Sequence, residues 1–467
     1  MTDFRPTGIN DAALDTEEDE AAYGVSPEIV RTAREALQGH QAHVVRELVG
    51  GLHAADVADL LEQLTPEERE QFIDFTKQEI EAETLTHLDE DVREDVIEAM
   101  GPQEVAQAVS ELDSDDALDL LEDLDEEAKE KILASVPAEE RVILEKGLTY
   151  PEDSAGRLMQ QKLVAVPSYW TVGETIDFLR ASHDLPDDFY DLFIVDPAHK
   201  PIGTVPLSRA MRTKRPVKLT AIMETELRTV PVGMDQEEVA YMFRQYALVS
   251  VPVVDEDDRL VGVITVDDVV HVIEEETEED LMGLGGVGES DIHATPAVTA
   301  RRRIRWLLVT AFKTIVSSAV ISQFEATIEQ MVALAVLMPI VGAMAGDAGM
   351  QVVTVTVRAM ATRDLTPSNT LRVMLKELAV GGVNGIVFAA LLGVIAAVWF
   401  HNIPLAVVLG SAMIFNMLWA GIAGTVIPMG LVRLGVDPAI ASGPFLITTT
   451  DVIGFLSFLG LATLFLL

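Results

Sequence analysis

The chain has 467 residues, too many for a single hydrophobic core and enough for three or four domains. Its 76 acidic and 33 basic residues give a formal net charge of -43, a field that repels nucleic acid, so we expect no nucleic-acid partner. The absence of cysteine excludes disulfides and thiolate metal sites, and the absence of an HExxH motif excludes that class of zinc metalloprotease.

The acidic residues are unevenly distributed along the chain. Only seven of the 76 lie within residues 301–467, which leaves 69 for residues 1–300. Such an acidic half is most often a solubilising surface, and the alternative is a surface that collects hard cations.

The N-terminal segment, residues 1–25, is acidic and polar. It has neither the basic nor the apolar region of a signal peptide, and we expect a disordered tail. Residues 26–150 then show apolar residues at i, i+3 and i+4, which predicts short helices throughout. The stretch Ala55–Leu64 recurs as Asp115–Leu124, so we expect a small helical solenoid. Its acidic residues are expected on one exposed flank, namely Asp115, Asp116, Asp119 and Glu122.

Two repeats follow, one in residues 151–217 and one in residues 218–280. Met159 and Pro167 recur as Met223 and Pro231, 64 residues later, and Gly203 recurs as Gly262 after 59 residues. Each repeat predicts a strand–helix–strand–strand–helix unit, the pattern of a tandem CBS pair. Such pairs often bind adenine nucleotides, and many serve only as dimerising levers.

The second repeat runs into a crowded acidic helix, Val272–Asp280, with Glu274, Glu275, Glu278 and Glu279. Like charges at this spacing destabilise a helix unless solvent or counterions screen them. The segment is therefore either a solvated face or a clamp that closes when a divalent cation bridges acids of separate domains.

Residues 305–467 are typical of an all-α membrane domain. Residues 378–432 contain no charged residue for 55 positions, enough for two crossings of about 20 residues each. We expect five helices, at Trp306–Phe324, Gln330–Gly346, two within 378–432 that are separated at 401–404, and Pro438–Leu467. Basic residues cluster before the first helix, between the second and third, and between the fourth and fifth. The N-terminal half is therefore expected in the cytosol and the C-terminus outside.

Polar residues within these helices are the candidates for a cation pathway. Asp451 follows Thr448, Thr449 and Thr450 near the middle of the fifth helix, where a charge costs about 2.5–3.5 kcal/mol. Oxygen ligands of this kind suit Mg²⁺ and Ca²⁺, and the alternative is a carboxyl that only bonds neighbouring helices.

Three further polar positions belong to the same set. The small-residue stretch Gly342–Gly349, which contains Asp347, predicts an interruption of the second helix that exposes carbonyl oxygens. Asn416 is a pathway candidate for which plain packing is the competing interpretation. Lys313, in the first helix, either snorkels, pairs with Asp347 or repels cations.

The order of motifs resembles the MgtE family of Mg²⁺ transporters over residues 30–467. The resemblance is carried by Leu148–Met159, Phe324–Glu325, Arg358–Leu365, Leu434–Pro438 and Thr450–Gly454. It implies a homodimeric, Mg²⁺-selective channel of the bacterial inner membrane that is gated by cytosolic Mg²⁺ and is not an enzyme. The implied fold is multi-domain: an α-helical solenoid-like N domain, an α/β tandem CBS pair, a plug helix within residues 281–304 and the five-helix membrane domain.

The resemblance also implies site residues. It assigns the pore ion to Asp451, whereas Asp347, Asn416 and Thr448 are further pore candidates from the polar residues of the spans themselves. The regulatory ions are assigned to acidic residues of the helical domain, the second CBS unit and the start of the fifth helix: Asp115, Asp116, Asp119, Asp267, Asp268, Glu274, Glu275, Glu278, Glu279 and Asp437. The plug helix falls within Asp291–Arg303, and ATP is a further expected ligand of the CBS pair.

The chain departs from the family at Asp347, since the family commonly has asparagines in that stretch. An added carboxylate affects the choice among Mg²⁺, Co²⁺ and Mn²⁺. The competing hypotheses are a gradient-coupled carrier or exporter of a divalent cation, a sensor without transport, and an intramembrane aspartyl protease that uses Asp347 and Asp451.

Overall fold

A computed structural model describes residues 24–122, 124–182, 185–186, 188–285, 287, 295–366 and 368–467. The predicted tail, residues 1–25, lies almost wholly outside the described residues, as do residues 288–294 of the expected plug region. The chain forms two compact units, Met1–Glu274 and Glu275–Leu467, each of which is described by itself. We call them the acidic unit and the membrane unit.

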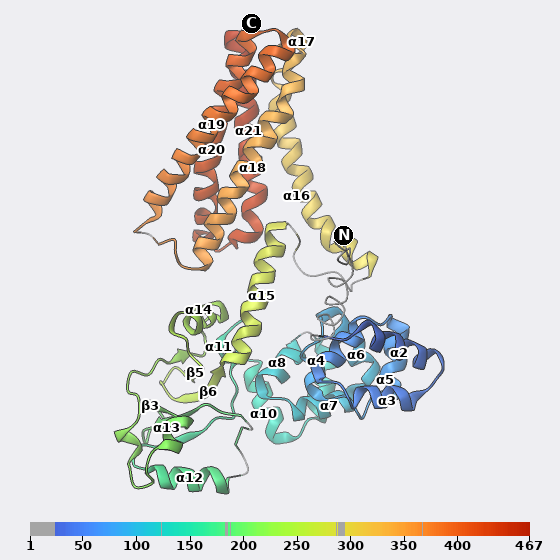
Figure 1. The fold of residues 1–467 in the computed structure, drawn as a ribbon, viewed down its shortest axis with the longest axis vertical. Helices are drawn as coiled ribbons and strands as arrows, with labels where there is room; N and C mark the ends of the chain where they lie inside the picture. Colours follow the sequence, from blue (N-terminus) through green and yellow to red (C-terminus); the bar gives the residue numbers. More distant parts are fainter. Residues whose placement is uncertain are drawn as a thin grey trace, which may run out of the picture. The chain divides into compact units, whose positions relative to one another are not determined.

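The first part of the acidic unit is a helical domain (Figure 1). Its elements are α2 (Pro27–Gln38), α3 (Ala42–Val49), α4 (Ala54–Glu62), α5 (Pro66–Thr76), η1 (Ala82–Leu85), α6 (Glu90–Met100), α7 (Pro102–Glu111), α8 (Ser114–Glu122), α9 (Glu126–Ser135) and α10 (Ala138–Gly147). Helix α5 shows why these helices stay short. A capping box of Thr65 and Glu68 starts it, and its apolar face is completed within three turns by the fully buried Phe72 and Ile73. The predicted series of short helices is confirmed.

Two small α/β units follow in the acidic unit. The first has α11 (Ala155–Leu158), β1 (Ala165–Pro167), α12 (Val172–Ala181), β2 (Asp191–Val195), β3 (Pro201–Pro206), α13 (Leu207–Arg212) and η2 (Leu219–Ala221). The second has β4 (Val230–Pro231), α14 (Gln236–Tyr246), β5 (Ser250–Val254), β6 (Leu260–Thr265) and α15 (Val266–Gly285). Each sheet has its first strand parallel to the second and its third antiparallel to the second, so the predicted repeat is confirmed.

The repeated methionines and glycines have a packing explanation. A Cβ at Gly262 would lie 2.6 Å from Sδ of Met159, and a Cβ at Gly203 would lie 3.0 Å from Sδ of Met223. The segment that precedes each unit therefore crosses the sheet of the other unit, where only glycine leaves room for it. This reciprocal crossing joins the two units into one pair.

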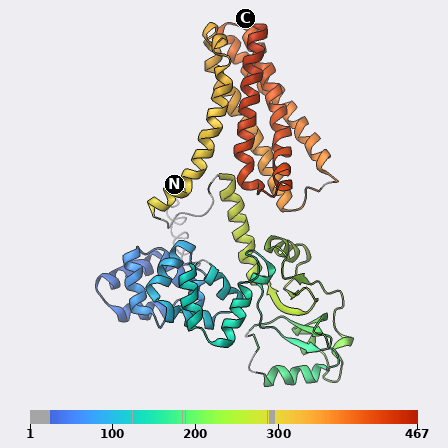
Figure 2. The same cartoon turned by 180° about the vertical axis from the view of Figure 1, so that it is seen from behind.

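The membrane unit contains five helices that are long and apolar enough to cross a bilayer, together with a short helix, α17 (Glu325–Gln330). The five are α16 (Pro296–Ser322), α18 (Ala333–Ala361), α19 (Thr370–Phe400), α20 (Ile403–Arg433) and α21 (Pro438–Phe465). The predicted number and order are confirmed. Figure 2 shows these helices side by side from behind, and α20 packs against α18, α19 and α21.

One prediction for this unit is wrong. Helix α18 runs without interruption through Gly342–Gly349 and reaches Ala361, beyond the predicted end at Gly346. The glycines serve close packing instead, since a Cβ at Gly349 would lie 2.8 Å from Cδ2 of Leu446 on α21. A membrane helix keeps all its backbone hydrogen bonds internal, and tight contact with α21 removes any need for a break.

Candidate cation sites

The acidic unit contains a buried cluster of carboxylates where the helical domain meets the second α/β unit. Asp115 and Asp116 lie in the first turn of α8, and Asp268 lies in the first turn of α15. The two elements are held together by the segment that leads into the first α/β unit. The Gln161 amide donates to Oγ of Ser114 at 2.9 Å, and Nε2 of Gln160 donates to Oδ2 of Asp268 at 3.4 Å.

The prediction that Asp115 lies on an exposed flank is wrong. Asp115 is only 6% exposed, and its Oδ1 has no hydrogen-bond partner. Helical periodicity places Asp115 on the polar face of α8, but a neighbouring domain covers that face. Burial, followed by the charges of Asp268 and Asp116, raises the pKa of Asp115 well above its usual range.

The other two members of the cluster respond to the same environment. Burial and the charge of Asp268 raise the pKa of Asp116 to about 7. Burial raises the pKa of Asp268 to about 6, although Oγ1 of Thr265 donates to its carboxylate at 2.6 Å and favours the charged form. The pKa values of all three carboxyls are raised because, among the described residues, no positive charge near them balances their negative charges. A bound divalent cation would supply that charge.

The remaining acidic candidates of the helical domain are engaged in ion pairs. Asp119 is exposed and lies 2.8 Å from the Arg93 guanidinium. Glu122 was expected on the exposed flank but is half-buried, because Arg157 holds it at 2.9 Å across the junction with the first α/β unit. Burial raises the pKa of Glu122 in spite of Arg157.

The candidates on α15 are on its surface. Asp267, Glu274, Glu275, Glu278 and Glu279 are all exposed. The next residue, Asp280, is half-buried, and burial together with the charge of Asp437 raises its pKa. Asp437 caps the start of α21 by accepting from the Ala439 amide at 2.8 Å. Sequence reasoning named Asp437 and missed Asp280 as its partner, although Asp280 ends the acidic run.

No group of three or more histidine or acidic side chains is arranged as a closed metal site within the described residues. Mg²⁺ usually retains several waters and binds one or two carboxylates directly. Open pairs of carboxylates, such as Asp116 with Asp268 and Asp280 with Asp437, suit that mode of binding better than a preformed cage.

The membrane unit places Asp451 on α21 against helices α16 and α18. The residue is half-buried, and a Cβ at Gly342 would lie 3.1 Å from its Oδ1. Ser317 of α16 is 5% exposed and interacts with the Asp451 carboxyl, although its hydroxyl forms no hydrogen bond of ordinary geometry. Lys313 lies one turn earlier on α16 and is half-exposed.

The other pore candidates do not all lie beside Asp451. Asn416 is fully buried; its Nδ2 donates to the Val341 carbonyl at 3.2 Å, and its Oδ1 has no partner. Thr448 is half-buried and donates to the Pro444 carbonyl at 2.7 Å. Asp347 is exposed on α18, and in the described part of the chain no ion pair joins it to Lys313.

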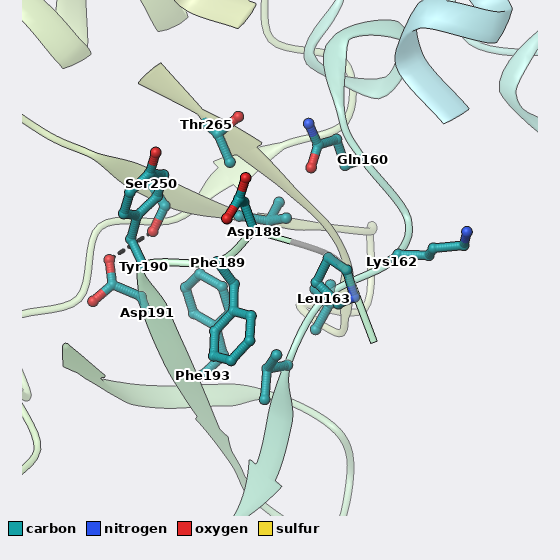
Figure 3. Close-up of a pocket in the computed structure, with 13 residues that line it drawn as sticks. Gln160, Lys162, Leu163, Asp188, Phe189, Tyr190, Asp191, Phe193, Ser250 and Thr265 are labelled. Atoms are coloured by element: carbon teal, nitrogen blue, oxygen red, sulfur yellow. Dashed lines mark hydrogen bonds between the residues drawn. The ribbon is translucent and has the colours of Figure 1, made fainter. Parts of the chain in front are cut away.

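A small cavity of about 20 Å³ lies where the two α/β units meet (Figure 3). Phe189 and Tyr190 offer aromatic faces for a base, and Lys162 is the one basic side chain among the lining residues. Asp191, which accepts from Oγ of Ser250 at 2.7 Å, and Asp188 add negative charge. A space of this size has room for about one water molecule, so the pocket as it stands holds no adenine ring, and its single basic side chain offers a triphosphate few donors.

Five apolar helices with a carboxylate inside them, joined to a CBS pair and an acidic helical domain, define an integral membrane protein with a large acidic portion outside the spans. Comparison with known proteins makes this specific. Residues 338–461 match the family model for MgtE, described as a divalent cation transporter, residues 52–153 match the MgtE intracellular N domain, and residues 219–275 match a CBS domain.

Whole-chain relatives agree with these matches. The chain is 35% identical to the magnesium transporter MgtE of Thermus thermophilus over 440 residues, 93% of this chain and 97% of the relative. It is 33% identical to the magnesium transporter MgtE of Enterococcus faecalis over 329 residues, 70% and 73% of the two chains. The chain therefore belongs to the MgtE family, and the resemblance in its sequence is confirmed.

A solved structure also resembles the acidic unit. The cytosolic domain of the Mg²⁺ channel MgtE in complex with ATP is 31% identical and covers 52% of this chain and 99% of that chain, with a TM-score of 0.48.

Proposed function

We propose that the protein is a Mg²⁺-selective channel of the bacterial inner membrane that is gated by cytosolic Mg²⁺. The cargo is supported by the relatives, two of which are named magnesium transporters and align with most of this chain. The relatives are transporters, which supports the proposal that the chain acts without enzymatic chemistry.

The observation that carries the transport proposal is the position of Asp451. It is a half-buried carboxylate within a membrane-spanning helix, and Gly342 of α18 packs closely against it. A mid-membrane charge is costly, so it is retained where it serves a pathway. In a homodimer, two copies of Asp451 would bind one hydrated Mg²⁺, which needs few direct protein ligands.

Gating is proposed to reside in the acidic cluster. Without Mg²⁺, the charges of Asp115, Asp116 and Asp268 repel one another and favour separation of the helical domain from the second CBS unit. When internal Mg²⁺ rises, the ion neutralises them and the two domains close. A ligand that binds one state better than the other shifts the population in this way. A plug helix ahead of the first span would transmit the closure, and part of it lies outside the described residues.

The orientation is inferred from the basic residues that flank alternate ends of the helices. Arg301, Arg302 and Arg303 lie near the start of α16, before its apolar part begins at Trp306, and Arg433 lies at the end of α20. The positive-inside rule then places the acidic half in the cytosol and the C-terminus outside. Binding of ATP at the CBS pair stays a prediction from the family resemblance.

Uptake into proteoliposomes tests the proposal. Mg²⁺, Co²⁺, Mn²⁺ and Ca²⁺ are offered in turn, without any Na⁺ or H⁺ gradient. We expect Mg²⁺ uptake that is lost in Asp451→Ala, because the ion then has no carboxylate to replace part of its hydration shell. Strict dependence on a Na⁺ or H⁺ gradient would establish the coupled carrier or exporter instead, and normal uptake by Asp451→Ala would remove the pore assignment.

The gate is tested separately. Neutralising Glu274, Glu275, Glu278 and Glu279 together should leave transport active at high internal Mg²⁺, since a bridged ion can no longer hold the closed state. The matched variant Asp268→Asn should weaken inhibition in the same direction. Inhibition that is unchanged in both variants would show that these acids are only a solvated surface.

A further inference from the structure

Asn416 is a fully buried polar residue of α20, and the proposed function does not assign it a task. It lies 13 residues after the first residue of this membrane-spanning helix and 17 before the last. A side-chain amide is costly to bury among apolar helices unless it forms hydrogen bonds. The groups that meet this amide therefore indicate what it does.

One side of the Asn416 amide is bonded to α18. Its Nδ2 donates to the Val341 carbonyl oxygen at 3.2 Å. A carbonyl oxygen only accepts, so this contact decides which end of the amide faces α18. The acceptor is a main-chain atom, so the bond fixes the backbone of α18 and not a side chain that could rotate away.

The other side of the amide lies against α21. A Cβ at Gly454 would lie 3.1 Å from Cγ of Asn416 and closer still to its Nδ2. Only glycine leaves room for the amide here, so α21 approaches Asn416 with its backbone. A single side chain of α20 therefore lies between the backbones of α18 and α21.

The same two stretches of α18 and α21 surround Asp451. Gly342 follows Val341 directly, and a Cβ at Gly342 would lie 3.1 Å from Oδ1 of Asp451, which is a close contact. Asp451 precedes Gly454 by three residues, so the two lie close together on one face of α21. The Asn416 amide and the Asp451 carboxylate are therefore packed against adjacent residues of α18. The position of α18 limits where the carboxylate can lie.

We propose that Asn416 is a positioning residue that sets the separation of α18 and α21 beside Asp451, and thereby the ion preference of the pore site. The proposal rests on the proposed role of Asp451 and gives Asn416 no direct contact with the ion. Mg²⁺ requires a nearly ideal octahedral set of ligands, whereas Ca²⁺ accepts a larger and less regular set. A carboxylate that is held in one place therefore favours Mg²⁺, and one that can shift loses this preference.

The test is Mg²⁺ uptake into proteoliposomes by Asn416→Ala, with the half-saturating concentration, the maximal rate and the inhibition constant of Ca²⁺ measured separately. Groups that orient a metal ligand typically change metal affinity about 10- to 100-fold when they are removed. The half-saturating concentration of Mg²⁺ should therefore rise about tenfold or more. The inhibition constant of Ca²⁺ should change much less, so the preference for Mg²⁺ over Ca²⁺ should fall.

A second variant moves the amide without removing it. In Gly454→Ala the new Cβ occupies the space of the Asn416 amide, so this variant should show the same rise in half-saturating concentration and the same loss of preference. Asn416→Ala vacates that space. Gly454→Ala should therefore add little further change when the two are combined, because both act through one contact. Gly460→Ala is the matched control on the same helix, since no other helix of the described chain lies within 4 Å of a Cβ there.

The measurements separate positioning from plain packing. A lower maximal rate with an unchanged half-saturating concentration and unchanged Ca²⁺ inhibition would overturn the proposal, because lost packing only reduces the amount of folded protein. Effects of Asn416→Ala and Gly454→Ala that add in the double variant would also overturn it, as would a Gly454→Ala variant that behaves like Gly460→Ala. Failure of the proposed function has another signature, since Asp451→Ala would then transport Mg²⁺ normally whatever residue lies at position 416.

Discussion

The acidic unit and the membrane unit mark their sites in opposite ways. In the acidic unit charged residues are abundant, and only the buried ones indicate a candidate site. Asp115, which is 6% exposed, is an example. In the membrane unit charges are rare, and the presence of Asp451 or Lys313 is itself the signal. Functional sites are therefore recognised by burial in the first unit and by residue type in the second.

The two units also differ in how they are packed. The helical domain has a core of large side chains, with Phe72 and Leu60 fully buried. In the membrane unit, glycines let backbones touch: a Cβ at Gly381 would lie 2.6 Å from the Met417 carbonyl oxygen, and one at Gly421 would lie 2.8 Å from that of Glu377. Lipid provides no hydrophobic drive between helices, so close contact has to provide the attraction.

The largest effect is expected from breaking this close contact. Gly381→Leu should destabilise the membrane unit by about 3 kcal/mol or more, because the α20 backbone cannot yield as a flexible side chain can. Gly382→Leu is the control, since its Cβ would meet only the end of Leu418 at 3.4 Å. Unfolding of the purified protein in detergent measures both, and equal stability of the two variants would show that backbone contact is not what holds α19 to α20.

Asp116→Asn should stabilise the acidic unit, whereas Gly381→Leu should destabilise the membrane unit. Removing a charge that burial and Asp268 disfavour should raise the free energy of unfolding by about 1–2 kcal/mol in the absence of Mg²⁺. The stabilisation that added Mg²⁺ gives the parent protein should shrink in the variant. Thermal unfolding of the full chain with EDTA and with Mg²⁺ measures this, and a destabilised variant would contradict the view that the cluster lacks positive charge.

The pH dependence of stability should also differ between the two units. The pKa values of Asp116 and Asp268, about 7 and about 6, lie above those of the unfolded chain. The folded state therefore binds protons more tightly, and stability without Mg²⁺ should rise as the pH falls from about 8 to about 5.5. We expect a contribution of about 2–4 °C in the melting temperature of the acidic unit. This contribution should be absent from Asp116→Asn combined with Asp268→Asn, and an identical pH profile would exclude the cluster as its source.

The smallest effect is expected at Asp119. Its carboxylate is 62% exposed and lies 2.8 Å from the Arg93 guanidinium. Asp119→Asn keeps an acceptor for Arg93 and should change the free energy of unfolding by less than about 1 kcal/mol, as exposed ion pairs usually do. Thermal unfolding compares it with Asp116→Asn, three residues away on the same helix. A change as large as that of Asp116→Asn would show that burial does not distinguish the two positions.

Local and periodic features could be predicted from the sequence. The five apolar spans, the short helices and the repeated α/β unit follow from residues within one turn, one strand or one repeat of each other, and the structure confirms them. The identity of Asp451 as the acidic residue at the middle of a span is also visible in the chain. These properties depend on hydrogen bonds and on a hydrophobic periodicity that are set by residues close together in the chain.

Only the tertiary structure decided what each charged or small residue faces. Asp115 is buried because another domain covers α8, and the glycines of α18 fit α21 instead of breaking the helix. Each of these outcomes joins residues more than ninety positions apart. The environment of a side chain depends on the surface packed against it, and no pattern within a single helix contains that surface.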